Sequence, residues 1–470
     1  MALTRPVYTC ERSLGTAWGQ SHKRRRNHEA MKSWRHWLVV GAIVFGCLPG
    51  VAGAASEVDI LLNKLVEKGI LNNVDAGQIR REITETKEER NKQLAKEIVP
   101  DSARNWKWKG DLRLRNEYRN RVGTGNDVNR QRIRFRYGFE GKANDQLKVT
   151  ARLATGTTLG GSVSGSTATT PFDDPTSTNK TFDDFFRKKP IVLDLAYVEY
   201  SPEIAGISKV TAIGGMMENP LWTVTPMVWD PDLTWDGVAL KLSKELGPVT
   251  VFSNNGAFAL DSDESEPAAL WVVQGGASVT PFANSETEVL KNLKLTSALA
   301  YHDYMNVTTS AKAGTDPITR IATNTASVKD FNQLNPSVEL ASQVAGYPVS
   351  LFGDWVHNAS ASSSGNDGFM VGLKVGKATQ PFSLTNLSGW LKKGWEAGYF
   401  FERLERDAAF DEFVDSDFGG GGTNRYGNVW WVTLAMLKHS TLGAKVLQAE
   451  QVTGAKAGED RILADWVTTF

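Results

Sequence analysis

Basic side chains are concentrated in three consecutive segments between residues 106 and 156. In the segment RQRIRFRYGFEG (130–141), arginines alternate with Ile, Phe and Tyr. Alternate residues of a strand share one face of a sheet, so this pattern separates a basic face from an apolar one. A surface of this kind creates a positive field that attracts and orients anions. The side chains predicted to form this basic wall are Arg113, Arg115, Arg132, Arg134, Arg136, Lys148 and Arg152.

Acidic residues gather in a second segment, 216–235, together with three prolines and three tryptophans. Proline restricts the backbone, and a loop so rich in aromatic rings is poorly suited to bulk water. We predict that this segment folds inward, although an ordinary surface loop is the alternative. The carboxylates that it and the following residue would supply are Glu218, Asp230, Asp232 and Asp236.

Other candidate sites are weaker. Segment 406–425 places five acidic residues before four glycines, but the spacing departs from an EF-hand loop, so a solvated acidic loop is the interpretation. The histidines at 302, 357 and 439 lack the spacing of metal ligands, and no Ser-His-Asp arrangement stands out. We therefore predict no metal site and no cofactor, and we do not expect an enzyme.

The elements that carry these side chains follow a period of two from residue 106 onward. Strict alternation predicts strands between one apolar and one polar environment. Sixteen segments are predicted as strands: 106–118, 130–140, 147–156, 190–201, 207–215, 236–244, 248–258, 268–280, 292–304, 335–345, 347–358, 366–377, 393–405, 426–437, 440–452 and 460–470. Alternation is least clear across 236–280.

Two architectures fit this pattern: a soluble β-sandwich, and a transmembrane barrel whose apolar face meets lipid. Strand length, aromatic residues at strand ends and long connections alternating with tight turns favour the barrel. We therefore predict an all-β transmembrane β-barrel of about 16 antiparallel strands over residues 105–470. In it, the basic wall would line the lumen and segment 216–235 would form a constriction.

The last predicted strand ends on an aromatic residue. In RILADWVTTF, Trp466 and the terminal Phe470 share one face with Ile462. An amphipathic strand ending in this way resembles the signal read by the outer-membrane assembly machinery. Trp466 and Phe470 are therefore predicted to act as an assembly signal.

The N-terminal part of the chain has a different character. Residues 31–54 combine a basic start, an apolar stretch and the small residues Ala52-Gly53-Ala54, the pattern of a secretory signal. We expect translation to start at Met31, with 1–30 as an upstream extension, and cleavage near Ala54; a lipoprotein signal ending at Cys47 is the alternative. Residues 55–104 are predicted to form a short helical periplasmic segment, with one helix ending at Gly69 and a second capped by Asp75.

Several segments together resemble a known family. VDILLNKLVEKGIL (58–71), KGDLRLRNEY (109–118), RQRIRFRYGFEG (130–141), LDLAYVEY (193–200) and GGMMENPLWTVTPMVWDPDLTWDGVALKL (214–242) are similar to the putative porins of Gram-negative bacteria. The resemblance implies an outer-membrane channel for passive diffusion of small polar or ionic solutes. Its expected partners are outer-membrane lipids, the assembly machinery and these solutes, with a trimer as the oligomer expected by analogy.

Composition narrows the remaining alternatives. Lys plus Arg and Asp plus Glu both number 53, so the net charge is zero, and a nucleic-acid-binding protein is not expected. Two alternatives to the channel remain open at this point. One is a barrel plugged by its own loops that serves as an anchor or binding protein, and the other is a soluble secreted β protein.

Overall fold

The computed structural model describes residues 57–82, 85–86, 105–122, 127–156, 175–183, 185–262, 267–307, 323–325, 328, 330–361, 364–454 and 457–470. The chain divides into two compact units, 1–98 and 99–470. Residues 1–56, with the predicted signal segment, and residues 87–104 lie outside the described residues.

The described residues of the first unit, 57–82 and 85–86, are mostly helical. Helix α2 spans Glu57–Glu67, and Gly69 follows it with a φ of +71°, the left-handed conformation that ends helices and favours glycine. A second helix begins at residue 73. Its cap is Asn72, whose side-chain oxygen accepts hydrogen bonds from the backbone N–H groups of Val74 and Asp75, so the prediction of Asp75 as the cap is wrong. Among the described residues, no helix is both long and apolar enough to cross a membrane.

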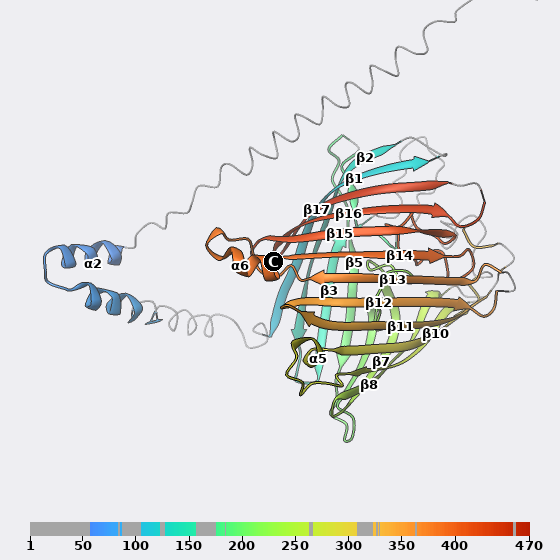
Figure 1. Ribbon diagram of the computed structural model, residues 1–470, viewed down its shortest axis with the longest axis horizontal. Helices are drawn as coiled ribbons and strands as arrows, with labels where there is room; N and C mark the ends of the chain where they lie inside the picture. The colour runs from blue at the N-terminus through green and yellow to red at the C-terminus, as the bar shows by residue number, and fades with distance from the viewer. Residues whose placement is uncertain are drawn as a thin grey trace, which may run out of the picture. The chain divides into compact units, whose positions relative to one another are not determined.

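The second unit is a closed antiparallel sheet of sixteen long strands (Figure 1). Each strand pairs with the next along the chain, and the last pairs with the first through twelve aligned positions, from Asp111 opposite Thr469 to Val122 opposite Gly458. The strands are β1 (Trp106–Val122), β2 (Val128–Lys142), β3 (Leu147–Thr155), β5 (Ile191–Tyr200), β6 (Lys209–Glu218), β7 (Thr234–Leu246), β8 (Val249–Asp261), β9 (Ala268–Val279), β10 (Lys294–Met305), β11 (Phe331–Val344), β12 (Tyr347–Asn358), β13 (Asp367–Gly376), β14 (Trp395–Leu404), β15 (Arg425–Leu437), β16 (Ser440–Gln451) and β17 (Gly458–Thr469).

The predicted barrel and its sixteen strands are confirmed, with strand ends shifted by a few residues. The structure adds β4 (Lys180–Thr181), a two-residue strand that pairs with the middle of β2. Two connections on the side of the tight turns contain helices: α5 (Glu288–Lys291), and η2 (Leu384–Asn386) followed by α6 (Leu387–Lys393). Figure 1 shows α5, α6 and the C-terminus at the same end of the barrel, which we name the turn end. The opposite end is the loop end.

Alternation sets the two faces of the barrel wall. Large apolar side chains such as Leu114, Leu153 and Leu351 are exposed on the outside, as a lipid-facing surface requires. On β9 both faces are apolar, because Trp271 and Val273 point outward while Leu270 and Val272 are buried inside. This explains why alternation in the sequence is weak over this part of the chain.

The interior of the barrel toward its loop end holds an apolar core. Two segments fold into the lumen: residues 219–233, named the first lumen loop, and residues 405–424, named the second lumen loop. Met227 and Trp229 from the first and Phe410 and Phe418 from the second are buried. They pack in one cluster with inward side chains of β9 to β16, including Tyr304 and Phe331. Burial of these rings stabilises the inward position of both loops.

Candidate functional site: the barrel lumen

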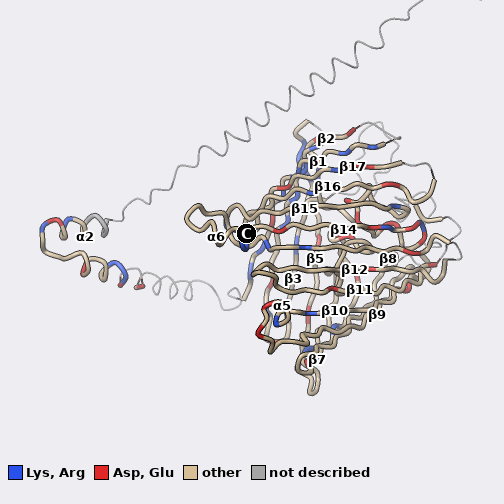
Figure 2. The backbone as a smooth tube through the Cα atoms, viewed as in Figure 1, with Lys and Arg blue, Asp and Glu red and all other residues tan. Residues whose placement is uncertain are grey.

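The side chains of the basic wall share the inner face of β1, β2 and β3. Arg115 and Arg134 are buried, whereas Arg113, Arg132 and Arg136 are partly exposed. Their apolar neighbours Leu114 and Tyr137 point the other way, toward the outside. Figure 2 shows the concentration of basic residues along β1 and β2. The predicted alternation therefore brings these five arginines together.

Acidic residues of the same strands and of distant ones neutralise the wall. Asp111, on β1 itself, accepts from Arg134 at 2.8 Å and from Arg136 at 2.5 Å. Asp465, on β17, binds both Nε and Nη2 of Arg115, at 2.8 and 2.9 Å. The wall is consequently a network of ion pairs and not a bare positive surface.

Glu117 is the most enclosed member of this network. Its side chain is 0% exposed and lies 2.9 Å from Arg130 and 3.3 Å from Arg132. Arg119 and Arg461 approach it at 3.7 and 3.9 Å. A buried carboxylate is stable as an anion only when opposite charges surround it. Burial opposes ionisation here, and four guanidinium groups offset that cost.

The first lumen loop brings Asp232 against the basic wall. The Asp232 carboxylate lies 3.1 Å from Arg134 and 3.8 Å from both Arg113 and Arg136. On the opposite side of the barrel the same loop is fixed by β12, where the Thr225 hydroxyl donates to Asp354 at 2.6 Å. The loop therefore crosses the lumen and presents a carboxylate to the arginines.

The second lumen loop brings Asp417 to the same wall. Its carboxylate lies 3.1 Å from Arg115 and 3.2 Å from Arg461. Burial disfavours the charged form, but Arg115, Lys445 and Arg461 hold the pKa of Asp417 well below its usual range. Asp417 is thus an anion at any working pH.

The two lumen loops are joined by Asp230. Its carboxylate accepts from the backbone N–H of Ser416 at 2.8 Å, and its own N–H donates to the Phe413 carbonyl at 2.8 Å. Burial and the nearby Asp415 raise the pKa of Asp230 to about 8. Burial likewise raises the pKa of Asp415. At neutral pH these two neighbouring buried carboxyls together carry less than two negative charges.

The remaining acids of segment 406–425 hold another part of the chain. Asp411 accepts from the backbone N–H groups of Thr323 and Asn324, and Asp407 accepts from that of Thr325. These carboxylates are buried, so the prediction of a solvated acidic loop is wrong. The sequence predicts the charge of these carboxylates, but it does not show from which backbone N–H groups they accept hydrogen bonds. The described part of the chain contains no group of three or more His, Cys, Asp or Glu side chains that could hold a metal ion.

The other predicted site residues lie apart from this contact. Lys148 pairs with Glu199 at 2.8 Å. Arg152 pairs with Asp194 at 2.5 Å and with Glu218 at 2.7 Å, and the Glu218 side chain is 63% exposed at the end of β6. Asp236 lies on the outer face of β7 with Val238, because Trp235 and Ala239 take the inward positions. Its assignment to the constriction is therefore wrong.

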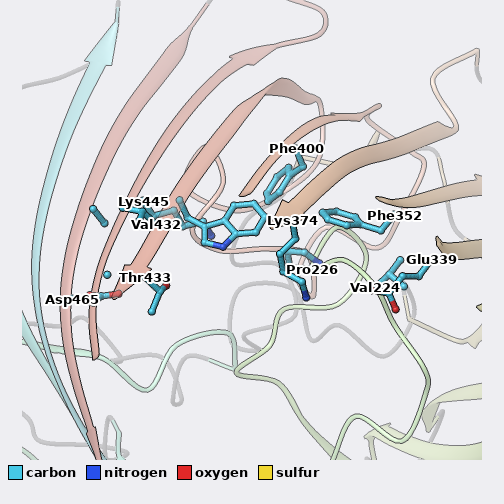
Figure 3. A pocket seen from close by; sticks show the side chains of 13 residues that line it. Val224, Pro226, Glu339, Phe352, Lys374, Phe400, Val432, Thr433, Lys445 and Asp465 are labelled. Atoms are coloured by element: carbon cyan, nitrogen blue, oxygen red, sulfur yellow. The ribbon is translucent and has the colours of Figure 1, made fainter. Parts of the chain in front are cut away.

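Two adjoining cavities lie against the first lumen loop: the smaller reaches the basic wall at Arg113, and the larger lies against β11 to β17. The smaller, about 100 Å³, is lined by Arg113, Asp232, Asp417 and Lys445 together with residues 176–179. The larger, about 360 Å³, shares Pro226 and Lys445 with it and is lined also by aromatic side chains (Figure 3). The smaller cavity is thus lined by two basic groups, those of Arg113 and Lys445, and by carboxylates of both lumen loops.

The C-terminal aromatic residue is fixed on the outer surface at the turn end. Phe470 and Gly110 exchange backbone hydrogen bonds of 3.0 and 2.8 Å. The Phe470 ring stacks with Phe135 and Tyr137 at centroid distances of 6.4 and 6.3 Å. Trp466 lies on the same strand face, and its indole N–H donates to Thr468 at 3.0 Å. Aromatic groups at this level of a barrel suit the membrane interface.

The chain also matches several solved structures at low sequence identity. OprB of Pseudomonas putida is 12% identical, with 78% of this chain and 94% of that chain covered and a TM-score of 0.49. OmpF of Salmonella typhi, in a complex with daunomycin, is 8% identical, with 78% and 97% covered and a TM-score of 0.43. The channel DcaP of Acinetobacter baumannii is 11% identical, with 78% and 97% covered and a TM-score of 0.42.

No curated protein matches the chain. A family match covers most of the barrel, in two overlapping segments, residues 119–347 and 323–470, and the family is described as "Putative porin". The chain therefore belongs to the putative porin family, and its closed antiparallel barrel is that of an outer-membrane porin channel.

Proposed function

We propose that solutes cross this porin along the basic wall, through the narrow space that faces Asp232 and Asp417. One observation carries the proposal: the cavity of about 100 Å³ is bounded by Arg113 on one side and by both carboxylates on the other. The rest of the cross-section near the loop end is filled by the apolar cluster around Trp229 and Phe410. We therefore place the solute path on the charged side of the lumen.

Opposed charges across a narrow aqueous path create a transverse field. Such a field orients polar solutes and admits ions of both signs, so we expect a channel for small polar or ionic solutes with at most a modest anion preference. The preference should weaken at high salt, because exposed charges are screened within about 10 Å at 0.1 M. The same arrangement gives Arg132, Arg134 and Arg136 a role in setting the selectivity.

Single-channel recording from the purified full chain in a planar bilayer tests the function. We expect discrete, ohmic conductance steps in KCl from protein that migrates as a heat-modifiable barrel. A correctly folded barrel that never conducts would instead support the loop-plugged alternative, in which the lumen loops close the barrel permanently. That alternative is favoured by the extent of apolar packing between the loops and the wall.

We also propose that residues 55–104 lie in the periplasm and are dispensable for the barrel. Their helical pattern and high charge are unsuited to a lipid-facing position, and β1 supplies all of its own pairing to β2 and β17. A chain that begins near Asp101, behind an unrelated signal segment, should still insert. Crosslinking of both forms would show whether a trimer exists and whether it depends on these residues.

Phe470 and Trp466 are proposed to be read by the assembly machinery while the barrel is being inserted. The support is their position on the outward face of the last strand, where Phe470 is 56% exposed. A pulse-labelling experiment that separates synthesis from insertion tests this role, since a change confined to insertion is expected when Phe470 is removed.

A further inference from the structure

We propose that the cavity of about 360 Å³ beneath the first lumen loop is a binding site for aromatic monocarboxylates, of which benzoate is the simplest. This proposal deepens the porin function by naming a solute class, and it rests on the presence of a solute path in the lumen. The cavity combines aromatic rings with two lysines that, among the described residues, form no close ion pair.

Glycines on the neighbouring strands make room for the two aromatic rings of the site. The Trp431 ring lies over Gly398, where an added Cβ would come within 2.2 Å of the indole. In the same way, the Phe352 ring lies over Gly372, where a Cβ would come within 2.4 Å. Both rings therefore lie against the wall with one face covered by backbone. The opposite faces line the cavity and can stack with a planar ligand.

The basic part of the site is set by strand register. Lys374 on β13 pairs with Gly398 on β14, Gly398 pairs with Trp431 on β15, and Trp431 pairs with Lys445 on β16. One row across the wall therefore reads Lys, Gly, Trp, Lys, with the indole over the glycine. Neighbouring strands stand about 4.8 Å apart, so the two lysine backbones are about 14 Å apart across the ring. An ammonium group is available on either side of the ring.

Neither lysine has a carboxylate within ion-pair distance among the described residues, whereas the acids of the cavity are already engaged. Asp465 is held by Arg115 through two hydrogen bonds, and Glu339 accepts from the Ser350 hydroxyl at 2.6 Å. Figure 3 shows Lys374 among Phe352, Phe400 and Pro226, with Lys445 and Asp465 on one side of them. Two ammonium groups without a close ion pair therefore lie beside apolar rings.

This combination selects a class of ligand. A flat ring can stack on Trp431 or Phe352, and a carboxylate can form the close ion pair that Lys374 and Lys445 lack. Because Glu339 and Asp465 also line the cavity, a second negative charge on the ligand would be repelled. An aliphatic acid would lose the stacking, and an uncharged aromatic compound would lose the ion pair. A small aromatic acid with one negative charge satisfies every group.

The test uses the full chain in a planar bilayer, with benzoate, cyclohexanecarboxylate and acetate as blockers of the KCl current. Benzoate should reach half-block at a concentration about fivefold or more below that of cyclohexanecarboxylate, since stacking alone accounts for such a difference. Trp431→Ala should abolish this preference. The double variant Lys374→Gln with Lys445→Gln should raise the half-block concentration of benzoate at least about fivefold.

Matched controls lie nearby. Trp430→Ala removes an exposed indole on the outer face of the same strand, and Lys377→Gln with Lys392→Gln removes two exposed charges at the turn end. Both should leave benzoate block unchanged. Equal block by all three acids in a wild-type channel with normal KCl current would overturn the site.

If the protein does not conduct at all, no KCl current is seen and block by the acids cannot be measured. Calorimetric titration of the detergent-solubilised chain with benzoate then separates the two claims. Binding that depends on Trp431 would retain the site and contradict conduction, whereas no binding would contradict the site as well.

Discussion

The carboxylate of Asp230 accepts a hydrogen bond of 2.8 Å from the backbone N–H of Ser416, and this contact joins the two lumen loops inside the barrel. Asp230 also caps its own turn, because it accepts from the N–H of Asp232 at 2.8 Å. Docking of the loops thus depends on one buried carboxyl group whose pKa lies near 8.

Loop docking should therefore weaken in alkaline solution. The unfolded chain releases this proton near the ordinary value of 3.8, whereas the docked carboxyl keeps it up to about pH 8. Between pH 3.8 and about pH 8 the docked state therefore binds more protons than the unfolded chain. The contribution of Asp230 to loop docking is complete below about pH 4, declines as the pH rises and is lost above about pH 8. Ionised Asp230 beside Asp415 would push the loops apart, and we expect single-channel conductance to be larger at pH 9 than at pH 6.

Asp230→Asn isolates this effect. The amide keeps an oxygen acceptor for Ser416 but cannot ionise, so the variant should retain the pH 6 conductance at pH 9. Asp236→Asn, on the outer face, is the matched control and should retain the wild-type pH response. The same conductance at both pH values in the wild-type channel would contradict the role assigned to Asp230.

Glu117 should be the carboxylate on which barrel stability depends most. Glu117→Gln removes the charge that Arg130, Arg132, Arg119 and Arg461 share, and breaking a buried ion pair costs about 3–5 kcal/mol. Glu140→Gln is the control, because the pair of Glu140 with Lys109 is largely exposed and should contribute only about 0–1 kcal/mol. Urea unfolding followed on detergent gels measures both. Similar midpoints for the two variants would refute the central position of Glu117.

The fold could be predicted from the sequence because each strand meets lipid on one side. Apolar residues such as Leu114 and Leu153 must alternate with the polar residues of the inner face, and the tight turns fix where each strand ends. The weak alternation at Leu270 and Val272 has a tertiary cause: these inward residues pack on the lumen loops and not on water. A local pattern carries no information about such packing.

The site could be predicted only in part. The shared face of Arg113, Arg115, Arg132, Arg134 and Arg136 follows from a period of two. The neutralisation of Arg115 by Asp417 and Asp465, more than 300 positions away, depends on barrel closure and loop folding, which no local pattern shows. Asp236 was assigned inward because it adjoins the loop, but the first inward residue of β7 is Trp235. A shift of one residue in a strand reverses the face.

We expect closure of the barrel at the seam between β1 and β17 to require both the Phe470 ring and a glycine at position 110. A Cβ on Gly110 would come within 2.5 Å of the Phe470 ring and 2.7 Å of the Arg136 carbonyl, so Gly110→Ala must displace the ring or the backbone. Such overpacking costs about 1–3 kcal/mol. We expect Gly110→Ala and Phe470→Ala each to lower the fraction of heat-modifiable barrel in the outer membrane at unchanged synthesis.

Thr469→Ala is the control for this seam, because the Thr469 side chain makes only a 3.4 Å contact to the His439 carbonyl and its backbone pairing is unaffected. It should insert normally. If Gly110→Ala and Phe470→Ala also insert at the wild-type level, the ring is not needed at the seam.

The most direct measurement of the proposed solute path is the zero-current potential of the double variant Asp232→Asn with Asp417→Asn in a KCl gradient. Both carboxylates face the basic wall at 3.1 Å. Their neutralisation removes the carboxylate 3.8 Å from Arg113, which lines the narrow cavity, and leaves Arg134 and Arg115 with Asp111 and Asp465 alone. The potential should shift clearly toward anion selectivity, more at 0.1 M than at 1 M salt. Asp236→Asn should leave it unchanged. A conducting double variant with the wild-type potential would mean that ions do not pass between the basic wall and the lumen loops.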